Sequence, residues 1–459
     1  MMAGKKRYIY VTIIAIIFFI ICYFVIYNVN LKFNQKNKNF LCMEKPEKKC
    51  QIPSFLPSKN DLEELDPKII TMEGLEGKDY TKYNSKFVLF NNIPYFRYWQ
   101  LENKEAYAFH PSKLGGVFYD LALEGRYCKL NDVFKSTLPF AVRLPNGGLT
   151  WYYPKIYPLS RMVGPYPQTS AYSQSSLLAG AMMMARNQPE IYSDFMHKIR
   201  LGLELDYHKG GVLWADKFFL ELPIYINPPE VILNGWIHAM LNYGDYVIQN
   251  KNKESKSIFE NSIKAMSQSL SYFDDPKHKL SLYSNASPIR VIYNKTNEEQ
   301  DFKLYFKPSI DKVPTYSLKL SKIKHSSCGE KERYNPYNAQ VLNEENNKIT
   351  AVMNCNGFYD TYIKSDSPFE IRFRTGKYDC KRATPDAGGL TFNYESEINA
   401  NGKHVVHFEQ DRKDLFCGYP TNFSKEGLNF YHMYHVVGLM YLAKCYEMND
   451  SIQKKLVLK

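Results

Sequence analysis

PEVILNGWIHAMLNYGDYVIQ, residues 229–249, sets the architecture of the chain. Its apolar residues recur every three to four positions and so line one side of a helix, with polar residues between them. The opening Pro-Glu pair is typical of a first helical turn. Gly235 stands inside this pattern, where glycine costs about 1 kcal/mol in propensity, and it therefore points to a close contact with another helix or with a ligand.

Other helical segments flank this one. TSAYSQSSLLAGAMMMAR, residues 169–186, begins with capping residues and is rich in small side chains, as in a closely packed inner helix. Residues 189–203 and 254–272 also have helical spacing. Antiparallel helix pairs joined by glycine-rich loops predict an α/α toroid rather than a bundle with short polar turns.

The pattern changes after residue 285. Runs such as FKLYFK (302–307) and KITAVMN (348–354) are short and rich in β-branched and aromatic residues, and Asn, Lys, Gly and Pro separate them. About eight such strands predict an antiparallel β-sandwich. Helical spacing returns over 425–448, so the β-region is predicted to be inserted in, or appended to, the toroid before its last helix.

An apolar segment stands near the N-terminus. Residues 8–29 contain no Asp, Glu, Lys or Arg, and as a helix they are long enough to cross a hydrocarbon core of about 30 Å. A cleaved signal peptide is the alternative, but its apolar part has about 7–15 residues and ends in small residues, whereas Phe24–Tyr27 are bulky. We predict one transmembrane signal anchor, followed by a stem rich in Asn and Lys.

Sequons and cysteines place the bulk of the chain outside the cytoplasm. Eight of the nine cysteines follow the anchor, which is compatible with disulfides in an oxidising compartment. Lysines flank the anchor on both sides, so charge does not decide the orientation. Four N-x-S/T sequons, which are candidate sites of glycosylation, begin at Asn285, Asn294, Asn422 and Asn449.

These observations predict a single-pass type II glycoprotein of the α+β class. Its parts are a cytoplasmic tail (1–7), a transmembrane signal anchor (8–29), a stem (30–85), an α/α toroid (86–284 plus 425–450) and a β-sandwich (285–424).

The composition excludes several function classes. The chain has no GxGxxG opening a helix, no GxxxxGK[ST], no HExxH and no GxSxG, and no cysteine pair has zinc-ribbon spacing. Nucleotide cofactors, zinc proteolysis and serine hydrolysis are therefore not supported, and no cofactor or metal is expected. The formal net charge of +12 suits a polyanionic ligand without requiring one.

A few polar residues stand where chemistry is plausible. Glu221 lies among apolar residues, which predicts a desolvated carboxyl group, although a salt-bridged loop acid has the same pattern. His432 and His435 share a helix face with Tyr431 beside them, and they could hold a carboxylate or a metal, move protons, or pack on the β-region. Tyr283 fits either a chemical role or cross-strand packing.

Taken in order, the segments resemble the D-glucuronyl C5-epimerase family, whose members convert glucuronate to iduronate within heparan sulfate-type chains. The resemblance covers about 140–285 and 425–448. It is carried by NGG (146–148), SAYSQSSLLAGAMMMAR (170–186), GGVLWADKFFLELPIYINPP (210–229), ILNGWIHAMLNYGDY (232–246), YFDDPKHKLSLYS (272–284) and YHMYH (431–435).

The resemblance implies an active site in the toroid with three acid/base residues, Glu221, Tyr283 and Tyr431. It also implies substrate contacts from Gln174, Asn234, Tyr225, His432 and His435. The chain departs from the family pattern in four ways, one being that the family's N-terminal β-domain is mostly missing. Leu222 stands where the family has a tyrosine, with Tyr225 as the nearby substitute. Asn429-Phe430 replaces Trp-Asp, and the β-region separates the hairpin from the last helix.

The implied reaction removes and returns the proton at C5 of a glucuronate residue. It needs a base on one face, an acid on the other and hydrogen-bonding or cationic groups for the charge that develops. Glu221 or Tyr431 could be the base and Tyr283 the opposing acid. A polysaccharide lyase and a non-catalytic glycan-binding protein of the same fold are the alternatives.

The expected partners are an acidic, heparosan-like polysaccharide, the membrane through one helix, and a second copy in a homodimer, but no nucleic acid. The expected location is the Golgi or endoplasmic reticulum membrane, with the catalytic part luminal.

Overall fold

The structure is a computed structural model, and the residues that it describes lie between 70 and 445. The predicted anchor over 8–29 and Tyr225 lie outside them. Within them, no helix has both the length and the apolar character needed to cross a membrane. The described residues are 70–71, 80–83, 87–98, 106–154, 169–221, 223, 228–275, 280–294, 302–319, 321–322, 340–345, 348–378, 390–395, 403–408, 419–420 and 429–445.

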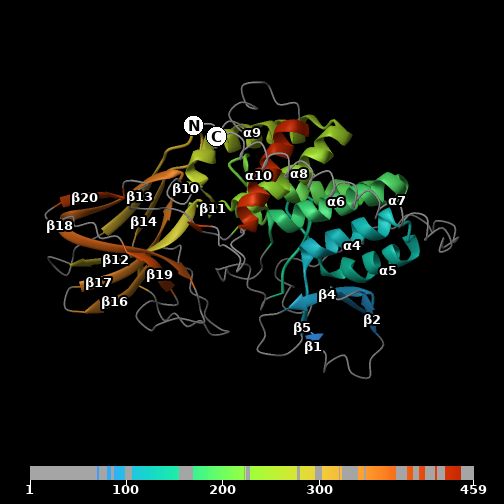
Figure 1. Ribbon diagram of the computed structural model, residues 1–459, viewed down its shortest axis with the longest axis horizontal. Helices are drawn as coiled ribbons and strands as arrows, with labels where there is room; N and C mark the ends of the chain where they lie inside the picture. Colours follow the sequence, from blue (N-terminus) through green and yellow to red (C-terminus); the bar gives the residue numbers. More distant parts are fainter. Residues whose placement is uncertain are drawn as a thin grey trace, which may run out of the picture.

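The described helices include the predicted ones. Residues 169–186, 189–203 and 254–272 are helical nearly as expected, since Ser170 and Asn252 cap two of the helices and Pro189 opens the third. Cys128, in α5, is disulfide-bonded. The helices, which Figure 1 shows together on one side of the molecule, are α4 (Pro111–Leu123), α5 (Tyr127–Thr137), α6 (Ala171–Asn187), α7 (Pro189–Leu203), α8 (Leu233–Asn250), α9 (Lys253–Ser269), α10 (Phe430–Cys445) and three short 3-10 helices, Leu138–Phe140, Tyr207–Lys209 and Leu270–Phe273.

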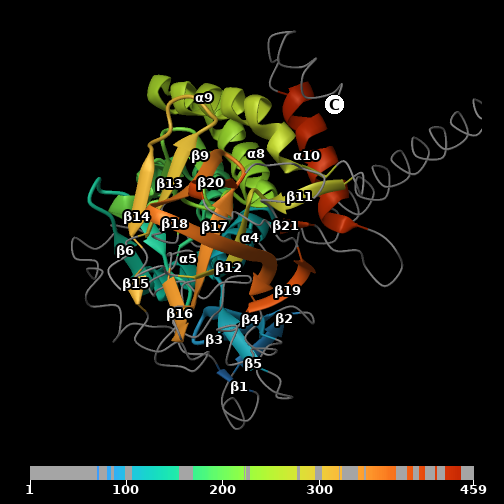
Figure 2. The ribbon, with the colours of Figure 1, turned by 90° about the vertical axis from the view of Figure 1, so that its left-hand side faces the viewer.

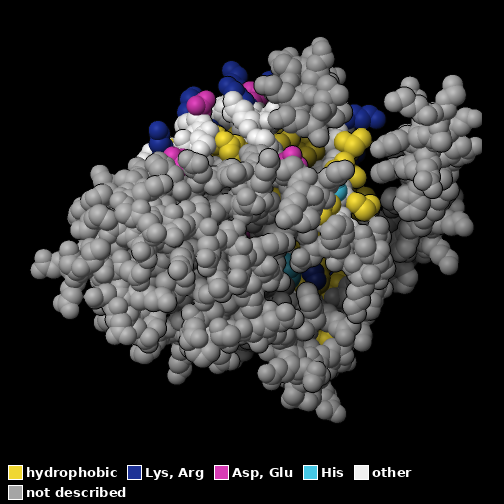
Figure 3. Space-filling view, turned by 60° about the vertical axis from the view of Figure 1, so that its left-hand side comes forward, with side chains coloured by type: hydrophobic (Ala, Val, Ile, Leu, Met, Phe, Trp, Pro, Cys, Tyr) yellow, Lys and Arg dark blue, Asp and Glu magenta, His cyan; other side chains and the backbone are white. Residues whose placement is uncertain are grey.

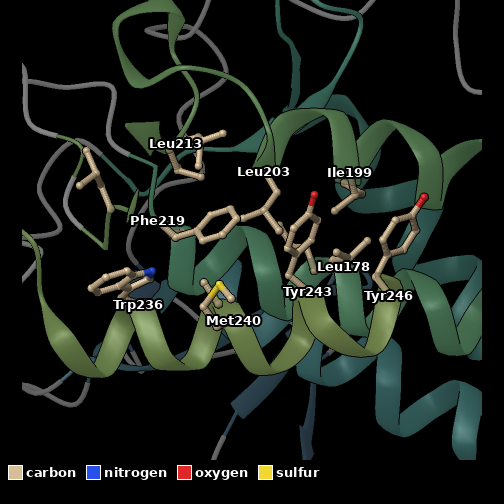
Figure 4. Packing of buried hydrophobic residues seen from close by; sticks show 14 of the residues in the cluster. Leu178, Ile199, Leu203, Leu213, Phe219, Trp236, Met240, Tyr243 and Tyr246 are labelled. Carbon is tan, nitrogen blue, oxygen red and sulfur yellow. The ribbon is translucent and has the colours of Figure 1, made fainter. Parts of the chain in front are cut away.

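Helix α8 carries the core of the helical part. Trp236, Met240 and Tyr243 stand four and three residues apart and are fully buried, so they form one apolar face. In Figure 4 they point from α8 toward Phe219 and toward Leu203 of α7. The ring centroids of Phe219 and Tyr243 lie 5.3 Å apart. The periodicity in the sequence therefore marked the buried face correctly.

The backbones of α4 and α6 touch where each helix has a glycine. A Cβ added to Gly115 would lie 2.3 Å from the carbonyl carbon of Ser176, and one added to Gly180 would lie 2.5 Å from the carbonyl oxygen of Gly115. The small residues of 169–186 thus form a closely packed inner helix, as predicted. Closure of the helices into a toroid stays a prediction.

A five-stranded antiparallel sheet precedes the helices, in the order β1-β5-β4-β3-β2. Asn91 and Asn92 form the two-residue turn between β3 and β4 with φ of 51° and 61°, a backbone that asparagine tolerates. Two of its strands fall within the predicted stem, because the aromatic runs after Tyr80 pair as hairpins. Its strands are β1 (Ile70–Thr71), β2 (Tyr80–Tyr83), β3 (Phe87–Phe90), β4 (Ile93–Tyr98) and β5 (Ala106–Phe109).

Two short hairpins border the helices, β6 (Ala141–Arg143) with β7 (Leu149–Trp151), and β8 (Leu213–Trp214) with β9 (Phe218–Phe219).

The β-region forms a nine-stranded sheet, mostly antiparallel, which lies beside the helical part in Figure 1. The first part of its long strand β18 pairs with β13 and β20, and the last part with β12 and β19. The mixed α+β class is confirmed, and the sandwich stays a prediction. The strands are β12 (Ala286–Asn294), β13 (Phe302–Pro308), β14 (Tyr316–Lys319), β15 (Ser321–Lys322), β16 (Gln340–Glu345), β17 (Lys348–Asn356), β18 (Tyr359–Tyr378), β19 (Leu390–Glu395) and β20 (Lys403–Phe408).

The chain enters and leaves the β-region at one place. Strand β11 (Leu280–Ser284) precedes it, and β21 (Tyr419–Pro420) follows it and pairs with β11, whose other neighbour is β10 (Asp274–Asp275). Figures 1 and 2 both show α10 beside α8 and β11. A Cβ added to Gly438 of α10 would lie 2.4 Å from Cγ2 of Ile237 on α8. Residues from α8, β11 and α10 therefore meet despite the long intervening segment.

Asn285 joins the helical part to the β-region. It is fully buried, its Oδ1 accepts a hydrogen bond from the backbone N–H of Val231, and its Nδ2 donates to Oδ1 of Asn356, both at 2.9 Å. The nitrogen that a glycan would occupy is therefore used inside the fold. This corrects the expectation for the sequon at Asn285, and the other three sequons stay predictions.

Candidate active site

Glu221 follows β9 and lies against the first turn of α8. A Cβ atom added to Gly235 would stand 2.2 Å from Oε2 of Glu221 and 2.4 Å from its Cβ. Oε2 is buried there, against the first turn of α8, and the N-terminus of a helix favours a negative charge. Gly235 thus makes the close contact that its position suggested, with a loop carboxyl group rather than with a helix or a ligand.

Gly235→Ala is expected to lower the free energy of unfolding by about 1–3 kcal/mol, because the new methyl group collides with Glu221. Gly116→Ala in α4 is the matched control, since nothing lies within 4 Å of its added Cβ. There the better helix propensity of alanine should raise stability by about 0.5–1 kcal/mol. Urea unfolding of both variants measures the difference. Equal stabilisation by both would contradict the contact with Glu221.

Tyr283 and Tyr431 adjoin this carboxyl group. Oη of Tyr283, on β11, donates to Oε1 of Glu221 at 3.4 Å. The ring of Tyr431, in the first turn of α10, meets the ring of Tyr283 edge-on, with centroids 4.9 Å apart and an interplanar angle of 84°. Tyr431 is 44 % exposed and Tyr283 is 9 % exposed, so solvent reaches the group from the side of α10. The structure brings together the three residues predicted as catalytic.

His432 and His435 connect α10 to β11 through Ser281. The backbone N–H of Ser281 donates to Nδ1 of His432 at 3.0 Å, which leaves Nε2 as the donor nitrogen of this ring. His435 is buried, with Nδ1 at 2.7 Å from Oγ of Ser281. Burial, and then the neighbouring His432, lowers the pKa of His435 to about 3. His435 therefore supplies no positive charge for a substrate carboxylate, whereas Nε2 of His432 can donate a hydrogen bond to one.

Gln174 and Asn234, predicted to bind substrate, differ in their surroundings. Nε2 of Gln174 donates to the carbonyl oxygens of Leu149 at 2.6 Å and Ile199 at 2.9 Å, so this fully buried side chain supports the packing of α6 and α7. Asn234 lies in the first turn of α8, and its buried Oδ1 has no hydrogen-bond partner among the described residues. Oε1 of Gln174 is likewise buried without a hydrogen-bond partner among the described residues, and substrate contacts from both residues stay predictions.

Three further side chains join the site, and the sequence did not reveal them. The rings of Tyr172 (α6) and His238 (α8) stack at 3.8 Å with an interplanar angle of 14°. Nδ1 of His238 lies 3.2 Å from Oη of Tyr434 on α10. The available signal was weak, since His238 stands one helical turn after Asn234 and Tyr434 lies inside YHMYH.

Burial and nearby charges, chiefly the carboxylate of Glu221, shift the pKa values of the side chains in this site. Burial, and then the charges of Glu221 and Tyr431, raise the pKa of Tyr172. Burial, then Tyr172 and Glu221, raise the pKa of Tyr434. Burial lowers the pKa of His238 to about 4, so its imidazole is neutral at physiological pH. Protonated phenols and neutral imidazoles around a carboxylate are suited to proton transfer. Within the described residues, no cluster of three His, Cys, Asp or Glu could hold a metal ion.

Comparison with known families tests the resemblance noted in the sequence. Residues 170–304 match the family model described as the D-glucuronyl C5-epimerase C-terminus. This segment belongs to that family. Of the candidate residues, Glu221 and Tyr283 lie within the epimerase segment, whereas Tyr431 and Tyr434 lie beyond it on α10 and meet it through packing on α8 and β11. No curated protein and no solved structure matches the chain.

Proposed function

We propose that the protein is a uronate C5-epimerase that converts D-glucuronate to L-iduronate residues within a glycosaminoglycan-type polysaccharide. One observation carries the proposal. The segment that matches the epimerase family supplies a carboxyl group, Glu221, bonded to a phenol, Tyr283, at 3.4 Å. This pair lies beside a partly exposed tyrosine on α10, so a polymer can reach it from that side.

The chemistry requires that a carbon acid lose and regain one proton. A base takes the C5 proton, and the electron pair of the C–H bond passes into the adjacent carboxylate as an enediolate. Glu221 is the acceptor because its carboxyl group is buried against Gly235 of α8 and adjoins the phenol of Tyr283 at 3.4 Å. The phenol of Tyr283 can donate to the oxygen that gains charge. Oδ1 of Asn234 can accept from a sugar hydroxyl group.

The proposal extends to the setting of the enzyme. An acidic, heparosan-like polymer suits the net charge of +12. A signal anchor over 8–29 would tether the epimerase in the Golgi or endoplasmic reticulum with its site in the lumen. A homodimer is part of the same proposal.

Incubation of the purified chain with heparosan-like polymer in heavy water tests the function. We expect deuterium at C5 and the appearance of iduronate, both read by NMR. A lyase would instead produce the ultraviolet absorbance of an unsaturated uronate. Absence of both signals, with polymer still bound in titration calorimetry, would indicate a glycan-binding protein and contradict the epimerase proposal.

A further inference from the structure

Epimerisation needs two proton-transfer groups, and the Glu221–Tyr283 pair supplies one face alone. Each group must stand about 3–3.5 Å from C5, on opposite faces, so the two lie about 6–7 Å apart. Oη of Tyr283 and Oε1 of Glu221 are 3.4 Å apart, too close to enclose a sugar ring. Tyr431 stands edge-on against Tyr283 and so belongs to the same side. The expectation that Tyr283 opposes Glu221 is therefore not met in this arrangement.

We propose that Tyr434, held by His238, is the acid/base residue on the opposite face of C5. The inference rests on the proposed function. Tyr434 projects from α10 one turn beyond Tyr431, and it is 37 % exposed, so a substrate can reach it. Its oxygen is bonded to His238 on α8, while the charge of Glu221 is near enough to raise its pKa. Tyr434 thus lies near the carboxylate of Glu221, but its oxygen is held by His238 of α8.

The neighbours of His238 fix which nitrogen carries its proton. Nε2 lies 3.1 Å from Nδ2 of Asn242 and 2.9 Å from Oγ of Ser176. The amide nitrogen can only donate, so Nε2 accepts from Asn242 and the proton resides on Nδ1, while the Ser176 hydroxyl donates to the carbonyl oxygen of Tyr172. Nδ1–H therefore donates to Oη of Tyr434. The phenol hydrogen of Tyr434 is then directed away from His238, and its oxygen is ready to bear charge.

The proposed step balances. Glu221 takes the C5 proton, and the C–H electron pair enters the substrate carboxylate. The electron pair then returns from the enediolate to C5 and forms the new C–H bond, on the other face, with the proton of Tyr434, whose O–H bond breaks. The phenolate that remains is stabilised by the hydrogen bond from His238. Glu221 ends protonated and Tyr434 deprotonated, and proton exchange with water restores both.

With one proton-transfer group on each face of C5, loss of Tyr434 should affect exchange from the two epimers differently. Tyr434→Phe should slow epimerisation by about 10²- to 10⁴-fold and leave deuterium exchange at C5 of D-glucuronate close to that of the wild type, since the Glu221 face can still remove and return a proton. Deuterium exchange at C5 of L-iduronate should slow by about the same factor as epimerisation, because Tyr434 acts on that face. Tyr441→Phe, on the same helix and 52 % exposed, is the matched control and should leave both rates unchanged.

His238 is a positioning residue, and a double-mutant cycle tests this. His238→Phe keeps the ring that stacks on Tyr172 and should slow epimerisation about 10-fold with the same one-sided exchange. The double variant, His238→Phe with Tyr434→Phe, should epimerise as slowly as Tyr434→Phe alone and no more slowly. Unchanged epimerisation, equal loss of exchange from both epimers, or the one-sided pattern in Tyr431→Phe instead would overturn the role of Tyr434. Absence of exchange in the wild type would overturn the proposed function itself.

Discussion

Glu221→Gln is expected to slow C5 exchange of D-glucuronate by at least about 10³-fold, within the range that general base catalysis supplies. The substitution keeps the shape of the side chain, so Gly235 and Tyr283 can still pack around it. It removes the carboxylate that accepts the proton. Heavy-water exchange followed by NMR measures the loss. A variant that retains more than one-tenth of the wild-type rate would show that another group is the base.

Two companion variants separate this effect from a change in folding. Glu190→Gln, exposed in the first turn of α7, makes the same chemical change at another helix N-terminus; it should leave exchange unaltered and lower stability by no more than about 1 kcal/mol. Glu221→Asp keeps the charge but shortens the side chain, so the contact of 3.4 Å with Tyr283 is lost, and an intermediate rate is expected. Glu221→Gln itself should cost no more than about 1 kcal/mol of stability, the usual value of a charge at a helix N-terminus.

The sequence predicted which segments are helical more accurately than it predicted where each helix begins and ends. Trp236, Met240 and Tyr243 follow the helical period because they share one buried face, and that requirement is local. The first residue of α8, in contrast, is determined by a contact with a distant part of the chain. The helix begins at Leu233 rather than Pro229, because the backbone of Val231 bonds to Asn285, which is 54 residues away. A tertiary contact outweighed the Pro-Glu signal.

The site was predictable where a family pattern exists and unpredictable where contacts cross the insertion. Glu221 and Tyr283 were found because their neighbours in the sequence resemble a known segment. His238 and Tyr434 are separated by 196 residues, and spacing along the chain cannot bring them together. The hydrogen bond that His432 accepts also needed the structure, because its donor is the backbone N–H of Ser281 in another element.

Arg200→Met is expected to lower the free energy of unfolding by about 3–5 kcal/mol, because it leaves the buried carboxylate of Glu204 without its cation. Nη1 of Arg200 donates to Oε2 of Glu204 at 2.6 Å, and their side chains are 3 % and 8 % exposed. Tyr243 and Ser255 both donate to Oε1 of Glu204 at 2.5 Å. The network thus joins α7, α8 and α9, and urea unfolding measures its loss.

The same helix contains the control for this buried pair. Lys198 and Asp194 are also four residues apart, at 2.7 Å, but their side chains are 24 % and 64 % exposed, so Lys198→Met should cost less than about 1 kcal/mol. Removing both buried charges, with Glu204→Met added to Arg200→Met, should restore part of the lost stability, since the hydroxyl groups of Tyr243 and Ser255 can bond to each other once the shared oxygen is gone. A double variant less stable than Arg200→Met would mean that hydrogen bonds to Glu204, and not its charge, dominate the network.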